Sequence, residues 1–500
     1  MTRDAHGDFV RRSLYAVEGL DVPAFAMDKK GAPATTRTVG PASYAPGCYE
    51  QLPRRREIAS SLNLPVHPAL PSTTLGQLSL GHMSTSGEIL DDLSIVLRFS
   101  YGVLRWEPYN DFKQHRAVPS PRSLFPLRIC LIVSDGRAGR IFEYSPPYHA
   151  LIELGNVAAT PRGCELVVLA PLANLPLYGE LAPTLTAIEA GALTAQLELM
   201  ARLVGWKAST RPITNAFAYR QLLSIDHWSV IPMISMELEA PSLVEKLLHL
   251  DIAPREIVDR HCNPGNMEKF PRVREYVKAC EAPRDYLPST MQLSTESRLG
   301  SAHKLDSYPA SDTSLIENVL NRSSGSRVHG LMGGKPPPDD GGITALLSDA
   351  IALAQLSSSS APAPSRMMLA VSNDTALPPG AYEVFTGNRA LVPIRQGRQP
   401  TSSSFEGAFN AKLDSLSGIV TIGSDLSGRY AESNSLRDAQ LAAGRSIQYL
   451  ALAAANRGMF ARPTRSFNGM LLYEDQAPGW DPIIQVAIGY PQVPNLTFRQ

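Results

Sequence analysis

The sequence contains few cysteines and has no excess of either charge. Its 500 residues include five cysteines, which are widely spread and form no C-x-x-C pair. An odd number of scattered cysteines argues against a disulfide framework and against a structural zinc site. Lys plus Arg and Asp plus Glu both number 47, so the formal net charge is zero. A protein that binds nucleic acid or an anionic membrane over its whole surface is normally basic, so we expect neither partner.

Long apolar runs are also lacking. The most apolar stretch, residues 167–177, is short and interrupted by prolines, whereas a membrane-spanning helix needs about 20 apolar residues. The N-terminal sequence MTRDAHGD is too polar for a secretory signal peptide. We therefore expect a soluble, cytoplasmic protein. The length of the chain and its 44% of hydrophobic residues predict more than one domain and a sizeable core.

Segments rich in Ser, Thr, Pro and Gly divide the chain. The longest covers residues 285–312, and shorter ones cover 334–342, 357–366 and 400–404. Such compositions offer too little apolar surface to offset the entropy cost of ordering the chain, so they predict loops or linkers. We expect the boundary between two large units in 285–312.

The most informative feature that is present is an internal repeat. Segments 189–206 and 442–459 both begin with an Ala-Gly pair and both have apolar residues at helical spacing. Each has a second glycine fourteen positions after the first, namely Gly191 and Gly205, and Gly444 and Gly458. These segments predict two equivalent helices.

The elements around these helices repeat in the same order. Helical periodicity is followed by a strand, an aromatic-rich strand and a third strand, and an apolar strand follows the glycine-bearing helix. The paired segments are 90–102 and 342–354, 127–154 and 367–394, and 231–236 and 482–488. Two Ala-rich helices can look alike by chance, but chance does not explain an ordered series. The two halves are therefore interpreted as divergent copies of one α+β unit.

This series resembles the nitroreductase-like flavoproteins, in particular the SagB-type dehydrogenases, which oxidise azolines in thiazole/oxazole-modified peptides. The resemblance covers most of the chain. It implies an α+β fold of two tandem modules, each with a mainly antiparallel sheet flanked by helices, that pack as a pseudo-dimer. The expected organisation is an N-terminal extension or wrapping arm over 1–75, modules over 76–245 and 313–500, and a connecting segment over 246–312.

In that family FMN lies between two modules, and its phosphate is held by an R-R-S-type motif that opens the first helix. The matching residues in the second copy are Arg322, Ser323 and Ser324, after Asn321, with Arg327 shortly beyond. Arginine offers a fork of donors to a phosphate, serine adds a hydroxyl, and a helix start adds free N–H groups. The equivalent segment of the first copy, residues 81–86, contains no arginine.

A second family motif, P-S-A-G-x-L-Y-P, lies along the flavin and comes from the partner module. The first copy matches it over 119–126, with Pro119, Ser120, Arg122 and Ser123 as candidate cofactor-binding residues. The second copy keeps only residues 363–366 of it. Because the two copies have lost different parts, we expect one intact composite site, and hence one FMN per chain.

Two further features of the second copy match the family. A P-x-x-x-F loop, whose backbone N–H groups face the flavin, corresponds to Pro463, Thr464, Arg465 and Ser466 before Phe467. A basic residue after a Gly-Tyr-Pro turn corresponds to Arg499, which could reach the phosphate or could be a solvated residue of the tail.

The resemblance also implies catalytic residues. A Lys-Tyr pair is associated with catalysis in the azoline dehydrogenases, and it corresponds here to Arg429 and Tyr430, with Tyr178 in the first copy. The reaction removes a Cα proton and delivers hydride to the flavin, so it needs a base and a neighbouring cation. Tyrosine beside arginine could supply both, although each tyrosine could also be a packing residue with a polar tip.

The sequence therefore predicts an FMN-dependent dehydrogenase that oxidises a peptide-derived heterocycle, azoline to azole, in natural-product biosynthesis. The implied partners are a modified peptide or amino-acid-derived substrate and a cyclodehydratase or carrier protein. One alternative is flavin-dependent oxidation or desaturation of a carrier-bound or small amino-acid substrate. A third is a flavin-free scaffold that supports a cyclising partner.

Overall fold

The computed structural model describes fourteen segments of the chain. They are residues 61–106, 114–157, 161–225, 228–250, 270–281, 302–305, 312–325, 331–337, 341–356, 366–396, 411–425, 433–464, 480–492 and 498–499.

Two seven-stranded sheets of identical topology form the frame of the molecule. The first has the order β1 (Ser61–Asn63), β6 (Ala150–Val157), β5 (Gly139–Ser145), β4 (Arg128–Ser134), β7 (Gly163–Pro171), β9 (Val230–Glu239) and β8 (Lys207–Pro212). The second has the order β10 (His303–Lys304), β14 (Ala390–Gln396), β13 (Gly380–Phe385), β12 (Arg366–Val371), β16 (Gly418–Asp425), β18 (Trp480–Gly489) and β17 (Phe460–Thr464). Neighbouring strands are antiparallel throughout both sheets. The α+β fold of two copies of one unit is confirmed.

The two sheets share their irregularities as well as their order. The register between β7 and β9 shifts between Pro232 and Ile234, and the register between β16 and β18 shifts between Pro482 and Ile484. Proline has no amide donor and is tolerated in a sheet at such a bulge. A bulge at the same place in each copy shows that the repeat extends to individual backbone hydrogen bonds.

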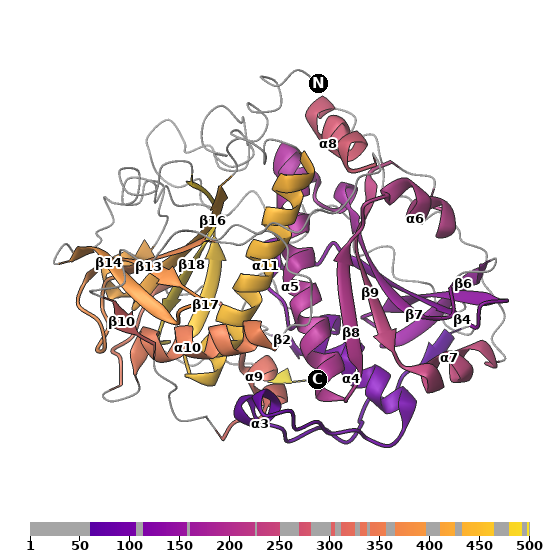
Figure 1. The fold of residues 1–500 in the computed structure, drawn as a ribbon, viewed down its shortest axis with the longest axis horizontal. Coiled ribbons are helices and arrows are strands. Elements are labelled where there is room, and N and C mark those ends of the chain that lie inside the picture. The colour runs from indigo at the N-terminus through magenta and orange to yellow at the C-terminus, as the bar shows by residue number, and fades with distance from the viewer. Residues whose placement is uncertain are drawn as a thin grey trace.

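Helices lie between and around the sheets. They are α3 (Leu75–Ser79), α4 (Ile89–Tyr101), α5 (Ala182–Leu203), α6 (Ala216–Leu222), α7 (Pro241–Leu248), α8 (Pro271–Glu281), α9 (Leu315–Asn321), α10 (Gly342–Gln355) and α11 (Ser433–Asn456). The long helices α5 and α11 run side by side through the centre, with one sheet on either side (Figure 1). The helices expected over 90–102, 189–206, 342–354 and 442–459 are confirmed, as α4, α5, α10 and α11.

The repeated glycines have two different tasks. Gly205 (φ 82°) and Gly458 (φ 64°) follow the ends of α5 and α11 in the left-handed conformation that commonly terminates a helix. Gly191 and Gly444 lie where the two helices touch. A Cβ at Gly191 would be 2.0 Å from the Leu441 carbonyl oxygen, and a Cβ at Gly444 would be 1.9 Å from that of Ile188.

These two glycine contacts describe a pseudo-twofold axis. Each glycine meets the residue that lies three positions before its counterpart in the other helix. This reciprocal pattern is that of an isologous dimer interface, here within one chain. The two modules are thus packed as the two subunits of a symmetric dimer would be.

The short helices α3 and α9 begin next to each other on the same pseudo-axis. Each begins with a capping box, formed by Thr74 and Gln77 in α3 and by Ser314 and Glu317 in α9. Thr74 and Ser314 form an isolated antiparallel bridge, and the Leu315 amide donates to the Thr73 carbonyl. The helices that precede the two expected phosphate-binding segments therefore start at symmetry-related positions.

The two sheets begin earlier than the modules expected from the sequence. β1 lies in the segment expected to be an extension, 1–75, and β10 lies in the expected connecting segment, 246–312. Each pairs with the edge of the sheet of its module, β6 and β14 respectively. Within the part of the chain that the structure describes, no helix has the length and apolar character needed to cross a membrane.

Candidate functional site

Arg322 of the second module reaches into the first module. Its side chain is only 3% exposed, and its guanidinium donates to the carbonyl oxygens of Arg116 (2.9 Å) and Val118 (3.4 Å). Pro119, where the flavin-wall motif begins, is the next residue after Val118. The structure thus brings the predicted phosphate segment of the second copy (321–324) into contact with the residues just before the predicted wall segment of the first copy (119–126).

The expectation that this segment opens a helix is wrong. Asn321 is the last residue of α9, and Arg322 is its C-cap, with φ −51° and ψ 125°. Arg105 donates to the Leu320 carbonyl at the same helix end, at 3.1 Å. A helix C-terminus carries partial negative charge, so the Arg105 guanidinium stabilises it, and a phosphate here would contact side-chain cations rather than free helix amides.

Ser323 joins this segment to the edge strand β17. Its carbonyl accepts the Ala461 amide (3.0 Å), and its hydroxyl accepts the Gly325 amide (3.1 Å). Pro463 and Thr464 continue the same strand and pair with β18, so these two positions belong to a strand and not to a loop. Arg465 and Ser466, the rest of that expected loop, lie outside the described residues, as does Arg327. Ser324 contacts Nη1 of Arg322 through its hydroxyl, at 3.5 Å.

The C-terminal strand also crosses to the first module. β19 (Phe498–Arg499) pairs with β2 (Arg105–Trp106), which in turn pairs with β3 (Gln114–His115). Arg499 is opposite Arg105, the residue whose side chain binds the end of α9. The backbone of Arg499 is therefore paired with the residue whose side chain binds the end of α9.

The wall segment has an unusual backbone. Arg122 (φ 49°), Ser123 (φ 51°) and Phe125 (φ 46°) all adopt left-handed conformations, around a short 3₁₀ turn, Pro121–Ser123. Such a conformation costs a non-glycine residue roughly 1–2 kcal/mol, and Arg122 stands where the family motif has glycine. Strained residues of this kind persist only where their surroundings impose the conformation, and they cluster at functional sites.

Glu189, on α5, helps to hold the wall segment in this conformation. Its carboxylate accepts the Ser120 hydroxyl (2.6 Å) on one oxygen and the Tyr101 hydroxyl (2.8 Å) on the other. The Ser120 hydroxyl accepts the Phe125 amide (2.9 Å), and the Tyr101 hydroxyl accepts the Leu127 amide (3.0 Å). The carboxylate therefore holds the wall segment at both ends, and we name these five residues the loop clamp.

The buried position of the Glu189 carboxyl group changes its pKa. Burial raises the pKa of Glu189 to about 7, against the opposing effect of the hydrogen bonds from Ser120 and Tyr101 and of the positive charge of Arg116. The Arg116 guanidinium lies 4.4 Å from the ring centroids of both Tyr101 and Phe125. No sequence motif indicated Glu189, because its partners are 69 and 88 positions away.

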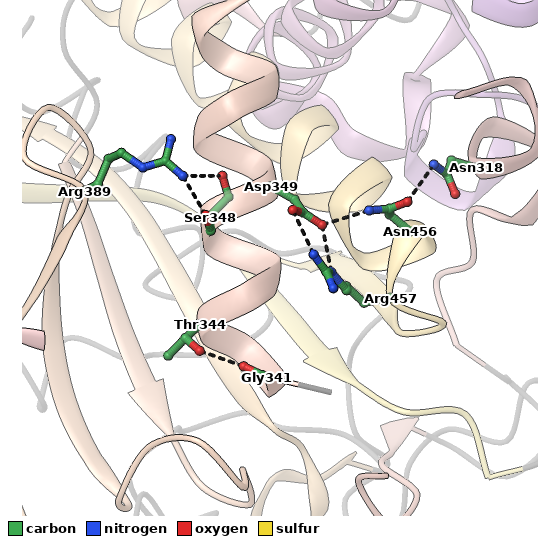
Figure 2. Close-up of polar contacts among 8 residues, drawn as sticks. All are labelled: Asn318, Gly341, Thr344, Ser348, Asp349, Arg389, Asn456 and Arg457. Atoms are coloured by element: carbon green, nitrogen blue, oxygen red, sulfur yellow. Dashed lines mark hydrogen bonds and ion pairs between the residues drawn. The ribbon is translucent and has the colours of Figure 1, made fainter. Parts of the chain in front are cut away.

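A polar network fixes the helix that presents Arg322 (Figure 2). Asp349 on α10 accepts two hydrogen bonds from the Arg457 guanidinium (2.8 and 3.0 Å) and one from the Asn456 amide (2.8 Å). The Asn456 side chain in turn accepts from Asn318, one turn before Arg322 on α9 (3.0 Å). Three helices are thereby held at the phosphate segment.

The first module has no such network at the equivalent positions. The repeat aligns Asn318 with Leu78, Asn456 with Leu203 and Arg457 with Val204, and these three apolar residues are fully buried. His82, the counterpart of Arg322, is exposed. The two phosphate segments therefore differ in side-chain placement and not only in sequence.

Other polar contacts are shared by the two modules. Arg389, in the turn before β14, donates to the Ser348 hydroxyl on α10 (2.6 Å; Figure 2). Its counterpart His149, in the turn before β6, contacts the Ser94 hydroxyl on α4 at 2.8 Å. Both turn residues have positive φ. The two modules therefore match at this turn and differ locally at the phosphate segment.

The predicted catalytic residues are placed only in part. Arg429 and Tyr430 lie outside the described residues. Tyr178 is in the 3₁₀ segment Pro176–Leu181 just before α5, where it is partly buried against the main core. Among the residues that the structure describes, no group of three or more His, Cys, Asp or Glu side chains is arranged to hold a metal ion.

Comparisons with known proteins extend this description. No protein-family model matches the chain, and no curated protein matches it. A solved structure from Anabaena variabilis, assigned as a nitroreductase, has a TM-score of 0.62 at 17% identity, and the match covers 84% of this chain and 91% of that one. That share exceeds either half of this chain, so the likeness includes both modules. The nitroreductase-like fold is confirmed.

Two further solved structures match with low TM-scores. One, from Ralstonia eutropha and also assigned as a nitroreductase, has a TM-score of 0.29 at 18% identity, and the match covers 36% of this chain and 88% of that one. The other is the Escherichia coli microcin synthetase McbBCD complex with truncated pro-MccB17 bound, with a TM-score of 0.25 at 13% identity, 48% of this chain and 97% of that one. Scores this low carry no argument about the present chain.

Proposed function

We propose that this chain is an FMN-dependent oxidoreductase with one composite flavin site between its two modules. The observation that carries the proposal is the contact of Arg322 with the Arg116 and Val118 carbonyls, which joins the phosphate segment of one module to the wall segment of the other. The nitroreductase-like fold supports it, because FMN lies between two modules in that family.

The residues around this contact fit the cofactor. Arg322 and Arg105 are both buried; Arg322 directly follows α9, and the Arg105 guanidinium donates to the Leu320 carbonyl in its last turn. Clustered guanidinium groups suit the two negative charges of one phosphate. The strained segment 119–126 supplies a backbone wall that the loop clamp holds in one shape.

Within this site the chain's own residues would have separate tasks. Arg322 would bind the phosphate, the wall segment would orient the ring system and exclude water, and Tyr430 beside Arg429, or Tyr178, would accept the substrate proton. The bound cofactor supplies the hydride acceptor. The substrate class we propose is a peptide-derived azoline. The proposed partners are the modified peptide and a cyclodehydratase or carrier protein.

One observation favours the scaffold alternative. The Arg322 guanidinium already donates to two backbone carbonyl groups of the first module, which is a structural role in itself. A phosphate would have to compete with, or add to, those contacts. The two functions are therefore distinguished by whether the chain binds flavin.

The experiment is reconstitution of the purified full-length chain with FMN, FAD or NAD, followed by gel filtration and absorbance spectroscopy. The proposal predicts that FMN is retained and that the dinucleotides are not. A chain that retains no flavin would support the scaffold. Anaerobic addition of a thiazoline-containing peptide should then bleach the bound flavin. Bleaching by a free amino acid and not by the peptide would favour the alternative oxidation.

A further inference from the structure

The loop clamp joins the wall segment to the centre of the molecule. Glu189 is 2% exposed and lies on α5, two residues before Gly191, where α5 and α11 are in closest contact. This contact holds the backbone of α5 beside Glu189, and the Glu189 side chain is itself buried. Its carboxylate is consequently a rigid acceptor for the two hydroxyl groups that reach it.

The wall segment depends on such an acceptor. Three of its residues are in left-handed conformations that non-glycine residues disfavour, so its shape is not the one that the free chain would adopt. Ser120 and Tyr101 each use their hydroxyl twice, once as donor to Glu189 and once as acceptor of a backbone amide at 125 or 127. The carboxylate orients both hydroxyl groups so that both amides are satisfied.

We propose that Glu189 is the positioning residue of the flavin wall: in its ionised form it holds segment 119–126, through Ser120 and Tyr101, in the shape that faces Arg322. This inference rests on the proposed function for the identity of the ligand. The clamp itself does not depend on the proposed function, and it can be tested without any ligand.

Protonation changes the clamp because a carboxyl group then has to donate. An ionised carboxylate accepts from both hydroxyl groups, whereas the protonated form accepts on one oxygen and donates from the other. The hydroxyl group that accepts this proton no longer donates to Glu189, so the clamp loses one of its two hydroxyl-to-carboxylate hydrogen bonds. Since the pKa of Glu189 is raised to about 7 by burial, this change falls in the neutral range.

The charged groups around Glu189 do not cancel the effect of its protonation. Among the described residues, the Arg116 guanidinium is the charge that acts on this carboxyl group. Charged side chains around α5 bond elsewhere: Asp92 to the Ser86 hydroxyl, Arg98 to the Val66 carbonyl, Arg437 to the Ile213 carbonyl and to Asp438, Arg445 to Glu198, Glu165 to Tyr219, Arg272 to Glu180, Lys207 to Glu239 and Arg211 to Glu237.

The first test is hydrogen exchange in the chain without added ligand. Glu189→Gln keeps the size of the side chain but presents an N–H group to one of the two hydroxyl groups. The amides of Phe125 and Leu127 should then exchange about tenfold faster or more, as expected when a hydrogen bond to a charged group is lost. The matched control is Glu143→Gln, whose partner is Arg128 on the first sheet, and it should leave both amides unchanged. Equal protection in Glu189→Gln and the parent would overturn the proposal.

The second test is FMN titration between pH 5.5 and 8. At pH 8 the parent should bind FMN about tenfold more tightly than Glu189→Gln, and at pH 5.5 the two should agree within about twofold. The titration of the FMN phosphate affects the parent and the variant equally, so it cancels in the ratio of their affinities. A ratio that does not change with pH would overturn the proposal. Absence of FMN binding to the parent would contradict the proposed function, and hydrogen exchange would then decide the clamp alone.

Discussion

Replacing Arg322 by alanine tests both of its roles at once. In the chain without ligand, Arg322→Ala leaves the buried carbonyl groups of Arg116 and Val118 without this donor, and each such loss costs about 1–3 kcal/mol. We therefore expect the free energy of unfolding to fall by roughly 2–4 kcal/mol, which is in the range of losses from a broken buried hydrogen-bond network. Denaturant unfolding without FMN measures this contribution.

The same substitution also removes the proposed phosphate contact. A charge-assisted hydrogen bond contributes about 1.5–3 kcal/mol, so FMN affinity should fall roughly ten- to hundredfold in variants that remain folded. Arg322→Lys keeps the charge but cannot form the fork of two bonds, so its affinity should be intermediate. Titration of folded protein with FMN at fixed salt measures the change.

The matched control is His82→Ala at the equivalent position of the first module. His82 is exposed, so this change should alter stability by no more than about 0.5 kcal/mol and should leave FMN affinity unchanged. The reasoning is refuted if Arg322→Ala loses stability but binds FMN as tightly as the parent, because the Arg322 side chain would then serve only to join the two modules. Equal losses of affinity in both variants would refute the asymmetry.

Four further changes test the rest of the structure. Asp349→Ala should lower the free energy of unfolding by about 3 kcal/mol and weaken FMN binding, because Arg457 loses its buried carboxylate partner. Gly444→Ala should cost at least about 2 kcal/mol, since its Cβ would overlap a backbone carbonyl, whereas Gly387→Ala, with open space around it, should be neutral within about 0.5 kcal/mol. Arg122→Gly should raise stability by up to about 1 kcal/mol, because relief of the left-handed strain slightly exceeds the entropy cost of glycine. As pH rises from 4.5 through 7, the free energy of unfolding of the parent should fall by about 3 kcal/mol relative to that of Glu189→Gln. The reason is that a carboxyl group whose pKa is raised in the folded state stabilises the fold most below its unfolded pKa. A difference that does not change with pH would contradict this.

The sequence predicted the repeat well because glycine is used where nothing else fits. The pairs Gly191 and Gly444, and Gly205 and Gly458, mark the helix crossing and the two helix ends, and both uses depend on the backbone alone. Side chains could therefore diverge around them without loss of the signal. The order of the elements followed from hydrophobic periodicity and was confirmed in each copy.

The candidate site was less accessible to sequence reasoning. Arg322 was expected at a helix start, but its helix begins earlier, at the capping box of Ser314 and Glu317, and has ended by Asn321. Glu189 lies in an Ala-rich helix and looks like a solvated residue, since nothing local shows that its partners come from α4 and from the wall segment. The alignment of the repeats did contain one usable signal. Asn456 and Arg457 replace Leu203 and Val204 at buried positions, and a polar pair in place of an apolar one indicates a local task.

The central claim is that one chain holds one flavin, in the site that Arg322 and segment 119–126 form together. The measurement is the molar ratio of FMN to chain after saturation and gel filtration, from flavin absorbance and amino-acid analysis. The account predicts a ratio of about one in the parent and near zero in Arg322→Ala, with His82→Ala unchanged, since only one of the two predicted phosphate segments carries an arginine. A ratio near two, or equal loss of flavin from Arg322→Ala and His82→Ala, would contradict it.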